Sequence, residues 1–247
     1  MDITNLFIEK EKPLERLISD GGFCGIFRTI GCIGDSLSSG EMEFYDVEGK
    51  RRYIDMYEYS WGQYIARITG SKVYNFSRGG MTAKEYVESF AEENDYWNPK
   101  FACQAYIIAL GVNDMGRAGF EETFSEYYST IVQKLKDIQS DAKLFFMTML
   151  SGETYGAHKH IDLHTQMLYE IANRYTNCYV MDFQKYGPTC DAEFKEKFFL
   201  TNHLNPCGYI LTAKMVMSYM DYIIRHNMDD FRRVALIGQN MSEVNYG

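Results

Sequence analysis

The sequence predicts an α/β protein in which a five-stranded parallel sheet lies between two layers of helices. Strand-like and helix-like patterns alternate five times along the chain, and the connections between the strands are far too long for hairpins. The chain has 247 residues, of which 46% are hydrophobic and 15% aromatic, which is enough for one sizeable core. We therefore expect one domain over residues 1–247.

Each predicted element rests on a local pattern. The strands are short apolar runs, at residues 30–33, 72–76, 104–110, 144–150 and 178–182. The helices are amphipathic or capped segments, at residues 57–69, 82–91, 122–139, 162–175 and 205–225. Asn205 and Pro206 supply an N-cap and a first-turn proline for the last of these helices.

Three further segments have weaker patterns. Within residues 1–28, the amphipathic stretch around 14–18 predicts a capping helix that ends at Asp20-Gly21-Gly22. Residues 41–55 predict a small hairpin or an ordered loop. A short helix is expected after Asp229, in a C-terminal tail over residues 227–247.

Composition and charge exclude several classes of protein. The net charge of −9 and a pI near 5.1 argue against nucleic-acid binding, and no basic run is longer than Lys50-Arg51-Arg52. The first ten residues lack the pattern of a secretory signal, and no apolar stretch approaches the about 18 residues of a membrane span. Six cysteines without C-x-x-C spacing are interpreted as reduced core residues. We expect a cytoplasmic protein, and the oligomeric state has no readable signal.

Polar residues and glycines follow the predicted strands at one end of the sheet. Ser36 follows the first strand, Gly80 the second and Asn113 the third, and His203 precedes the last long helix. The carboxyl ends of parallel strands meet at one edge, near the switch point between the first and third strands of a flavodoxin-like order. The sequence therefore predicts a site at this edge.

Four sequence blocks resemble the GDSL, or SGNH, hydrolase family. They are Gly34-Asp35-Ser36-Leu37, the segment from Asn75 through Gly80 to Thr82, Gly111-Val112-Asn113-Asp114, and the segment from His203 to Gly208-Tyr209. The blocks occur in order over residues 31–209. This resemblance implies the SGNH hydrolase fold and an acyl-transfer reaction.

The resemblance and the needs of acyl transfer assign roles to these residues. Ser36 is the candidate nucleophile and His203 the base that removes its proton. The backbone N–H groups of Ser36 and Gly80 and the side-chain amide of Asn113 are the candidate oxyanion donors. Asp35 and Asp114 are expected to support the turns, and Asp114 could equally be only a helix cap.

One position departs from the family pattern. The family places an aspartate three residues before the histidine, and here that residue is Leu200. Three alternatives stay open: a Ser-His dyad held by a backbone carbonyl near Leu200, an acid from elsewhere, or weakened catalysis. We favour the dyad, and the candidate acids are Glu153, Asp191, Glu193 and Glu196.

Three histidines lie together in a second segment. His158, His160 and His164 surround Asp162, and His160 and His164 are four residues apart, as in some metal sites. Acyl transfer needs no metal, so we predict neither a metal nor another cofactor. The segment is interpreted as a solvated loop and helix start, in which a contact with substrate stays open.

The leading hypothesis is a serine esterase that removes a short acyl group, with acetyl favoured, from a carbohydrate ester through an acyl-Ser36 intermediate. Within the enzymes, the alternative is a thioesterase or lysophospholipase, which a long apolar groove beside Ser36 would favour. A ligand-binding protein of the same fold without turnover is the alternative from another class. A flavin or dinucleotide binder is disfavoured, because no G-x-G-x-x-G follows the first strand.

Overall fold

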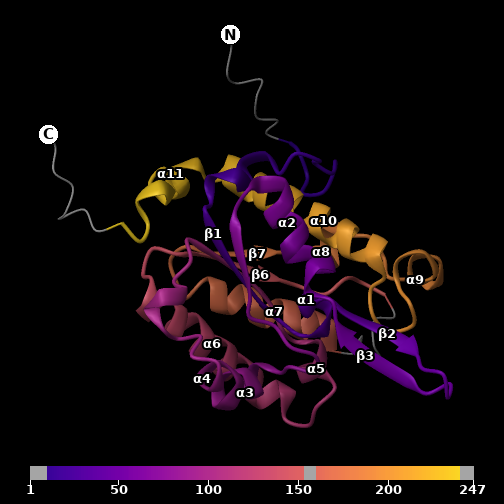
Figure 1. Cartoon of the computed structure of the whole chain (residues 1–247). Helices are drawn as coiled ribbons and strands as arrows, with labels where there is room; N and C mark the ends of the chain where they lie inside the picture. Colours follow the sequence, from indigo (N-terminus) through magenta and orange to yellow (C-terminus); the bar gives the residue numbers. More distant parts are fainter. Residues whose placement is uncertain (1–9, 153–159, 240–247) are drawn as a thin grey trace, which may run out of the picture.

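The computed structural model describes residues 10–152 and 160–239 and is built around a five-stranded parallel sheet (Figure 1). The strand order is β4-β1-β5-β6-β7, which confirms the predicted α/β class and the flavodoxin-like order. The strands are β1 (Thr29–Gly34), β4 (Lys72–Asn75), β5 (Ala105–Ala109), β6 (Lys143–Met147) and β7 (Cys178–Met181).

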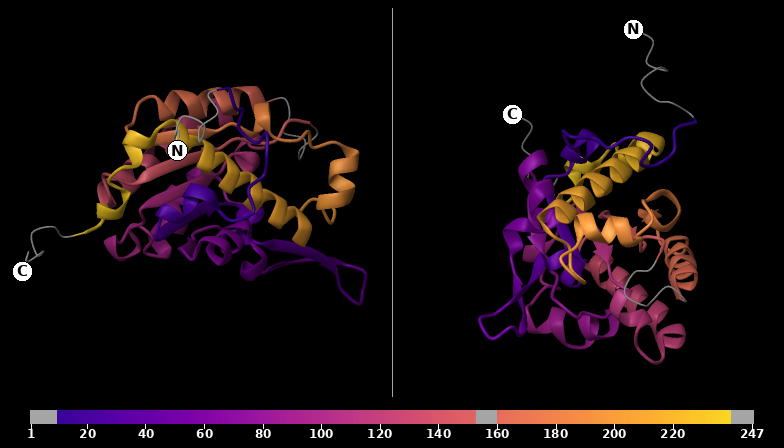
Figure 2. Two further views of the ribbon diagram at one scale, coloured as in Figure 1. Left: turned by 90° about the horizontal axis from the view of Figure 1, so that it is seen from above. Right: turned by 90° about the vertical axis from the view of Figure 1, so that its right-hand side faces the viewer.

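Helices cover both faces of the sheet, as Figures 1 and 2 show. On β5 and β6 successive side chains alternate between the faces: Ile107 and Phe145 belong to one core cluster, Ile108 and Phe146 to the other. All four side chains are fully buried. The first cluster packs under α2 (Trp61–Thr69) and α10 (Pro206–His226), and the second under α6 (Phe120–Ile138) and α7 (Ile161–Ala172).

The remaining elements are short. The helix predicted over residues 82–91 is interrupted, because a π-helical segment, Tyr86–Phe90, separates α3 (Ala83–Glu85) from α4 (Ala91–Glu93). The other α-helices are α1 (Ser36–Ser39), α5 (Val112–Met115), α8 (Phe183–Tyr186), α9 (Ala192–Phe198) and α11 (Met228–Phe231). Single 3-10 turns occur at Gly22–Ile26, Tyr57–Tyr59, Pro99–Phe101 and Val234–Leu236.

The start of α10 is fixed as the sequence predicts. Asn205 is the N-cap, its side-chain oxygen accepts a hydrogen bond from Gly208 N at 2.9 Å, and Pro206 is the first helical residue. The loop that carries His203 is therefore anchored at its C-terminal end. Within the described part of the chain, none of the helices has the length and apolar character that a bilayer-spanning segment requires.

A two-stranded hairpin projects from the edge of the sheet at which the β1 strand ends (Figure 1). It consists of β2 (Glu41–Tyr45) and β3 (Arg51–Asp55), which pair antiparallel with Glu43 opposite Tyr53. Because opposite residues share a face and successive residues alternate, Glu41, Glu43 and Tyr53 lie on the same face of the hairpin. Of the two predicted forms of this segment, the hairpin is confirmed.

The helix predicted around residues 14–18 is wrong. That stretch forms turns, and Leu14 has a left-handed φ of 61°. Long-range contacts to α10 replace the helix: Ile18 N donates to Ser218 Oγ at 2.9 Å, and Arg225 pairs with Glu11 at 2.6 Å. Tertiary hydrogen bonds outweigh the weak helical propensity of such a short segment.

Gly31, in the middle of β1, gives a test of the packing between the sheet and its second core cluster. A Cβ at this position would lie 2.6 Å from Tyr106 Cδ1 and 3.0 Å from Phe76 Cε2. Gly31→Ala is expected to lower the free energy of unfolding by about 1–3 kcal/mol, measured by urea denaturation. Gly25→Ala is the matched control, because a Cβ there meets nothing within 4 Å. Equal stability of the two variants would contradict this packing.

Candidate active site

Ser36 lies at the sharp turn where β1 passes into α1. Asp35 is the N-cap of α1, and its Oδ1 accepts a hydrogen bond from Leu37 N at 2.9 Å. Gly34 is needed before it, because a Cβ there would collide with the Ser38 side chain. Ser36 is partly exposed, although Asp35 before it is buried. The turn thus presents a serine hydroxyl at the carboxyl edge of the sheet.

The predicted backbone donors are available at this edge. Gly80 lies in the turn after β4 with a φ of 72°. Among residues 10–152 and 160–239, neither Ser36 N nor Gly80 N has a hydrogen-bond acceptor, and Ser36 Oγ has no partner. Asn75 joins the two turns, since its side-chain amide donates to Ser38 O at 3.2 Å and Ser39 O at 3.3 Å.

Asn113 brings the third turn to the same place. Its amide nitrogen donates to Asp35 Oδ2 at 3.3 Å and to Met81 O at 3.1 Å. The turns after β1, β4 and β5 are therefore tied together by one side chain. In this structure both N–H groups of the Asn113 amide are hydrogen-bonded to the turns. Asn113 could therefore act as the third oxyanion donor only after one of these hydrogen bonds breaks.

Two buried aspartates brace this arrangement. Asp114 Oδ1 accepts a hydrogen bond from Ala83 N at 2.9 Å, at the start of α3. Burial raises the pKa of Asp114 to about 6. Burial also raises the pKa of Asp35 to about 7. The hydrogen bond from Leu37 N opposes this rise, and the charge of Asp114 adds to it. Asp35 is therefore partly protonated near neutral pH.

His164 is a buried brace that the sequence patterns do not identify. Its Nε2 lies 3.0 Å from Leu110 O, at the end of β5, and its ring packs against Gly111. Burial lowers its pKa to about 4, although the hydrogen bond to Leu110 opposes the shift, so the ring is neutral. The solvated-loop interpretation is thus wrong for His164, which helps to place the turn that carries Asn113.

The metal interpretation of the histidine segment finds no support in the described residues. His160 Nδ1 lies 3.5 Å from Glu121 Oε1, while His164 is directed at a backbone carbonyl. Within residues 10–152 and 160–239, no three His, Cys, Asp or Glu side chains are arranged so that they could hold a metal ion. His158 lies outside the described residues.

His203 lies in the loop before α10 and contacts the hairpin. Its Nε2 is 3.0 Å from Glu41 Oε1, and its Nδ1 is 3.7 Å from Glu43 Oε2. The Tyr53 ring meets the imidazole edge-on, with 5.4 Å between the ring centres. Three side chains on one face of the hairpin thus surround the histidine.

None of the predicted supports for His203 that the structure describes contacts the imidazole. Asp191 caps α9, Glu193 pairs with Lys197 at 2.6 Å and Glu196 is exposed; Glu153 lies outside the described residues. His203 Nδ1 has no hydrogen-bond partner in the described residues and Nε2 faces Glu41, so no backbone carbonyl near Leu200 in this part of the chain holds the imidazole. Sequence reasoning missed Glu41 and Glu43, whose signal is the E-x-E alternation on a strand directly after the Ser36 turn.

Glu43 and His203 shift one another's pKa. Glu43 is 6% exposed, and its Oε1 accepts a hydrogen bond from Asn202 N at 2.7 Å. Burial raises the pKa of Glu43, but hydrogen bonds from Thr201 and Asn202 and the nearby imidazole outweigh it, so the net shift is downward. Burial lowers the pKa of His203, but Glu41 and Glu43 outweigh it, so the net shift is upward.

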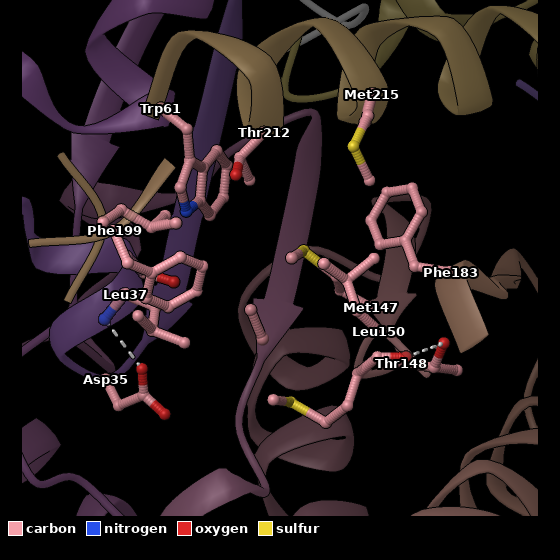
Figure 3. Close-up of a pocket in the computed structure, with 14 residues that line it drawn as sticks. Asp35, Leu37, Trp61, Met147, Thr148, Leu150, Phe183, Phe199, Thr212 and Met215 are labelled. Atoms are coloured by element: carbon pink, nitrogen blue, oxygen red, sulfur yellow. Dashed lines mark hydrogen bonds between the residues drawn. The ribbon is translucent and has the colours of Figure 1, made fainter. Parts of the chain in front are cut away.

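An apolar pocket of about 70 Å³ lies beside the Ser36 turn. Asp35 and Leu37, the residues on either side of Ser36, are part of its wall. Figure 3 shows Trp61, Phe199 and Leu37 on one side of the pocket and Phe183, Met147 and Leu150 on the other, with Met215 on α10 above. The pocket therefore extends from the wall formed by Asp35 and Leu37 into the space under α10, and Ser36 itself is not among its lining residues.

Comparisons with known proteins bear on the family and the fold of this chain. The sequence matches the model of the GDSL-like lipase/acylhydrolase family over residues 32–211. No curated protein matches the sequence. Several solved structures share the fold at low identity.

Three of these structures represent the range. A family two carbohydrate esterase from Clostridium thermocellum, in complex with cellohexaose, is 17% identical with a TM-score of 0.62. The match covers 90% of this chain and 67% of that one. A catalytic mutant of an acetylxylan esterase from Geobacillus stearothermophilus is 15% identical with a TM-score of 0.56, and the match covers 79% of this chain and 94% of that one. A putative lipolytic G-D-S-L protein from Desulfitobacterium hafniense is 18% identical with a TM-score of 0.57, and the match covers 78% of this chain and 99% of that one.

The family match covers most of the chain and includes the turns of Ser36, Gly80 and Asn113 and the loop of His203. The strand order places the first three of these at one edge of the sheet. The chain therefore belongs to the GDSL-like lipase/acylhydrolase family and is a serine hydrolase of that type.

Proposed function

We propose that this serine hydrolase is an esterase that removes a short acyl group, with acetyl favoured, from a carbohydrate ester through an acyl-Ser36 intermediate. The observation that carries the proposal is the Ser36 turn. A partly exposed hydroxyl without a hydrogen-bond partner in the described residues stands at the same edge as two N–H groups without acceptors. Acyl transfer requires these two features together.

The reaction follows from the groups present. Ser36 Oγ attacks the ester carbonyl carbon while His203 takes the hydroxyl proton. The oxyanion that forms accepts hydrogen bonds from Ser36 N and Gly80 N, and from Asn113 once its amide leaves Asp35. His203 returns the proton to the departing alcohol. Water, deprotonated by His203, then attacks the acyl-Ser36 carbonyl, the Ser36 Oγ–acyl bond breaks, and His203 returns the proton to Ser36 Oγ as the carboxylic acid leaves.

His203 must leave its resting contact before it can act as this base. Its Nε2 is paired with Glu41 at 3.0 Å, so Ser36 Oγ is not yet its partner. Catalytic hydrogen bonds often form only when substrate is bound, so the resting geometry is compatible with turnover. A ligand-binding role without turnover would be favoured by a histidine that is too far from Ser36 and has no supporting acceptor. His203 pairs with Glu41 and not with Ser36 in the resting structure, but it has two carboxylates beside it.

The size of the apolar pocket supports a small acyl group. A protein cavity of about 150 Å³ holds one benzene molecule, so a pocket of about 70 Å³ has room for only a few carbon atoms. A thioesterase or lysophospholipase with a long acyl chain would need a longer groove beside Ser36. The pocket therefore favours an acetyl or similarly short ester.

Two observations support a carbohydrate as the alcohol part. Similar folds include an acetylxylan esterase and a carbohydrate esterase in complex with cellohexaose. Tyr53, which is 51% exposed, stands edge-on to His203, so its ring borders the site from the solvent side. An aromatic face in this position can stack on the apolar face of a sugar ring.

Substitution of the proposed nucleophile, base and donor gives the first test, in turnover of p-nitrophenyl acetate. Ser36→Ala and His203→Ala are expected to fall to background, and Asn113→Ala is expected to lose about 10²- to 10³-fold in kcat. Ser89→Ala is the control, because this serine only donates to Glu85 O within its own helix. Undiminished turnover by Ser36→Ala would refute the assignment.

Widening the apolar pocket gives the second test. Leu150→Ala removes a half-buried wall residue and is expected to raise kcat/KM for p-nitrophenyl butanoate relative to acetate by about tenfold or more. Leu163→Ala is the matched control, because Leu163 is also half-buried but packs on the second core cluster. An unchanged ratio in Leu150→Ala would show that the acyl group does not enter this pocket.

A further inference from the structure

The hairpin places two carboxylates on the histidine whose usual acid is missing. Leu200 occupies the sequence position of that acid, and this residue is 48% exposed. Glu41 and Glu43 approach His203 instead, from strand β2 and far from it in sequence. Within the described residues, these are the carboxylates that form ion pairs with His203.

The two contacts differ in geometry. Glu41 Oε1 is within hydrogen-bond distance of Nε2, at 3.0 Å. Glu43 Oε2 and His203 Nδ1 are both buried, and neither has a hydrogen-bond partner in the described part of the chain, although they face each other at 3.7 Å. One can donate and the other accept, so an approach of roughly 1 Å would form a charge-assisted bond of about 2.8 Å and satisfy both atoms.

Glu43 is fixed to the same loop as the histidine. Its Oε1 accepts the N–H of Asn202, the residue before His203, at 2.7 Å, and Arg51 Nε lies 3.7 Å from its Oε2. The carboxylate is thereby attached to the residue next to His203. This is what an orienting acid requires, because the ring must keep one nitrogen toward the serine.

The hairpin is also tied to the Ser36 turn. Ser39 Oγ donates to Asp55 Oδ1 at 2.7 Å, and Tyr209 Oη donates to Glu41 O at 2.7 Å and lies 3.2 Å from Ser36 O. The strand that carries both glutamates is therefore positioned relative to the nucleophile.

We propose that Glu43 is the positioning acid of this site and that Glu41 holds the resting ring. In the productive state Glu43 accepts a hydrogen bond from Nδ1–H of His203. Nε2 then no longer contacts Glu41 and receives the Ser36 proton. The proton moves from Ser36 Oγ to Nε2, Nδ1 keeps its own proton, and Glu43 stays a carboxylate. This inference rests on the proposed esterase function.

The groups around His203 determine its pH dependence. Glu41 and Glu43 face it from β2 and Tyr53 from β3, the Asp35 charge acts on it from the turn after β1, and Arg51 lies 3.7 Å from Glu43. The carboxylates stabilise the imidazolium more than burial opposes it, so the pKa is raised. Because the base must be neutral, kcat/KM is expected to rise with pH through this raised pKa. Removal of a carboxylate should lower the His203 pKa and so move this rise of kcat/KM to lower pH.

The test combines kinetics on p-nitrophenyl acetate with an NMR titration of the His203 Cε1–H signal, assigned by its loss in His203→Ala. Glu43→Gln is expected to lower kcat by about 10²- to 10⁴-fold with KM changed less than about threefold, and Glu43→Asp to recover part of the loss. Glu41→Gln is expected to keep kcat within about tenfold and to shift the acidic limb downward. Both Gln variants should lower the His203 pKa.

Glu48→Gln is the matched control, because Glu48 is exposed at the hairpin turn. It should change neither kinetics nor titration. If Glu43→Gln fails to fold, as judged by its urea midpoint, Glu43→Asp with an unchanged kcat and pH profile would overturn the proposal. Full kcat in Glu43→Gln, or collapse of Glu41→Gln alone, would also overturn it. A wild type that hydrolyses no ester would refute the esterase function itself, whereas the other outcomes concern Glu43 only.

Discussion

The two hydrogen bonds of the Asn113 amide hold together the edge of the sheet on which the site depends. They reach Asp35 Oδ2 in the turn after β1 and Met81 O in the segment after β4. This is geometrically possible because β1 lies between β4 and β5 in the sheet, so the three turns emerge side by side. His164 supports the arrangement from within the core through Leu110 O. Residues far apart in sequence thus meet through strand order and one amide.

The electrostatics of this edge are a balance between acidic side chains and N–H donors. Burial raises the pKa of Asp35 to about 7 and that of Asp114 to about 6, so part of the negative charge is removed near neutral pH. Glu43 remains charged because backbone and side-chain donors of its neighbouring loop stabilise the carboxylate. The charge that remains favours an imidazolium at His203. The same field that would stabilise the protonated base during acyl transfer also retains its proton at lower pH.

Much of the fold could be predicted from the sequence, because buried parallel strands leave a strong local signal. The runs around Ile107 and Phe145 are apolar on both faces, and the long connections between them require crossovers. The capping of α10 by Asn205 is equally local. The stretch around Leu14 could not be predicted, because its turns depend on α10 contacts some two hundred residues away, as in the bond from Ile18 N to Ser218 Oγ.

The same distinction applies to the candidate site. Ser36, Gly80 and Asn113 follow strands and are accessible to sequence patterns, whereas the acids that the sequence offers for His203 are Glu153, Asp191, Glu193 and Glu196, all between β6 and α10. Glu41 and Glu43 lie at the other end of the sequence, and only the way the hairpin folds back determines which of its faces meets the imidazole. Side-chain direction across a hairpin of this kind depends on tertiary contacts.

The central claim is that Ser36 is a nucleophile activated by His203. It is tested most directly by the intact mass of the protein after reaction with a serine-directed fluorophosphonate, followed by peptide mapping. We predict a single adduct on Ser36 that forms much more slowly in His203→Ala. An adduct on another residue, or an equal rate of labelling without His203, would contradict the account.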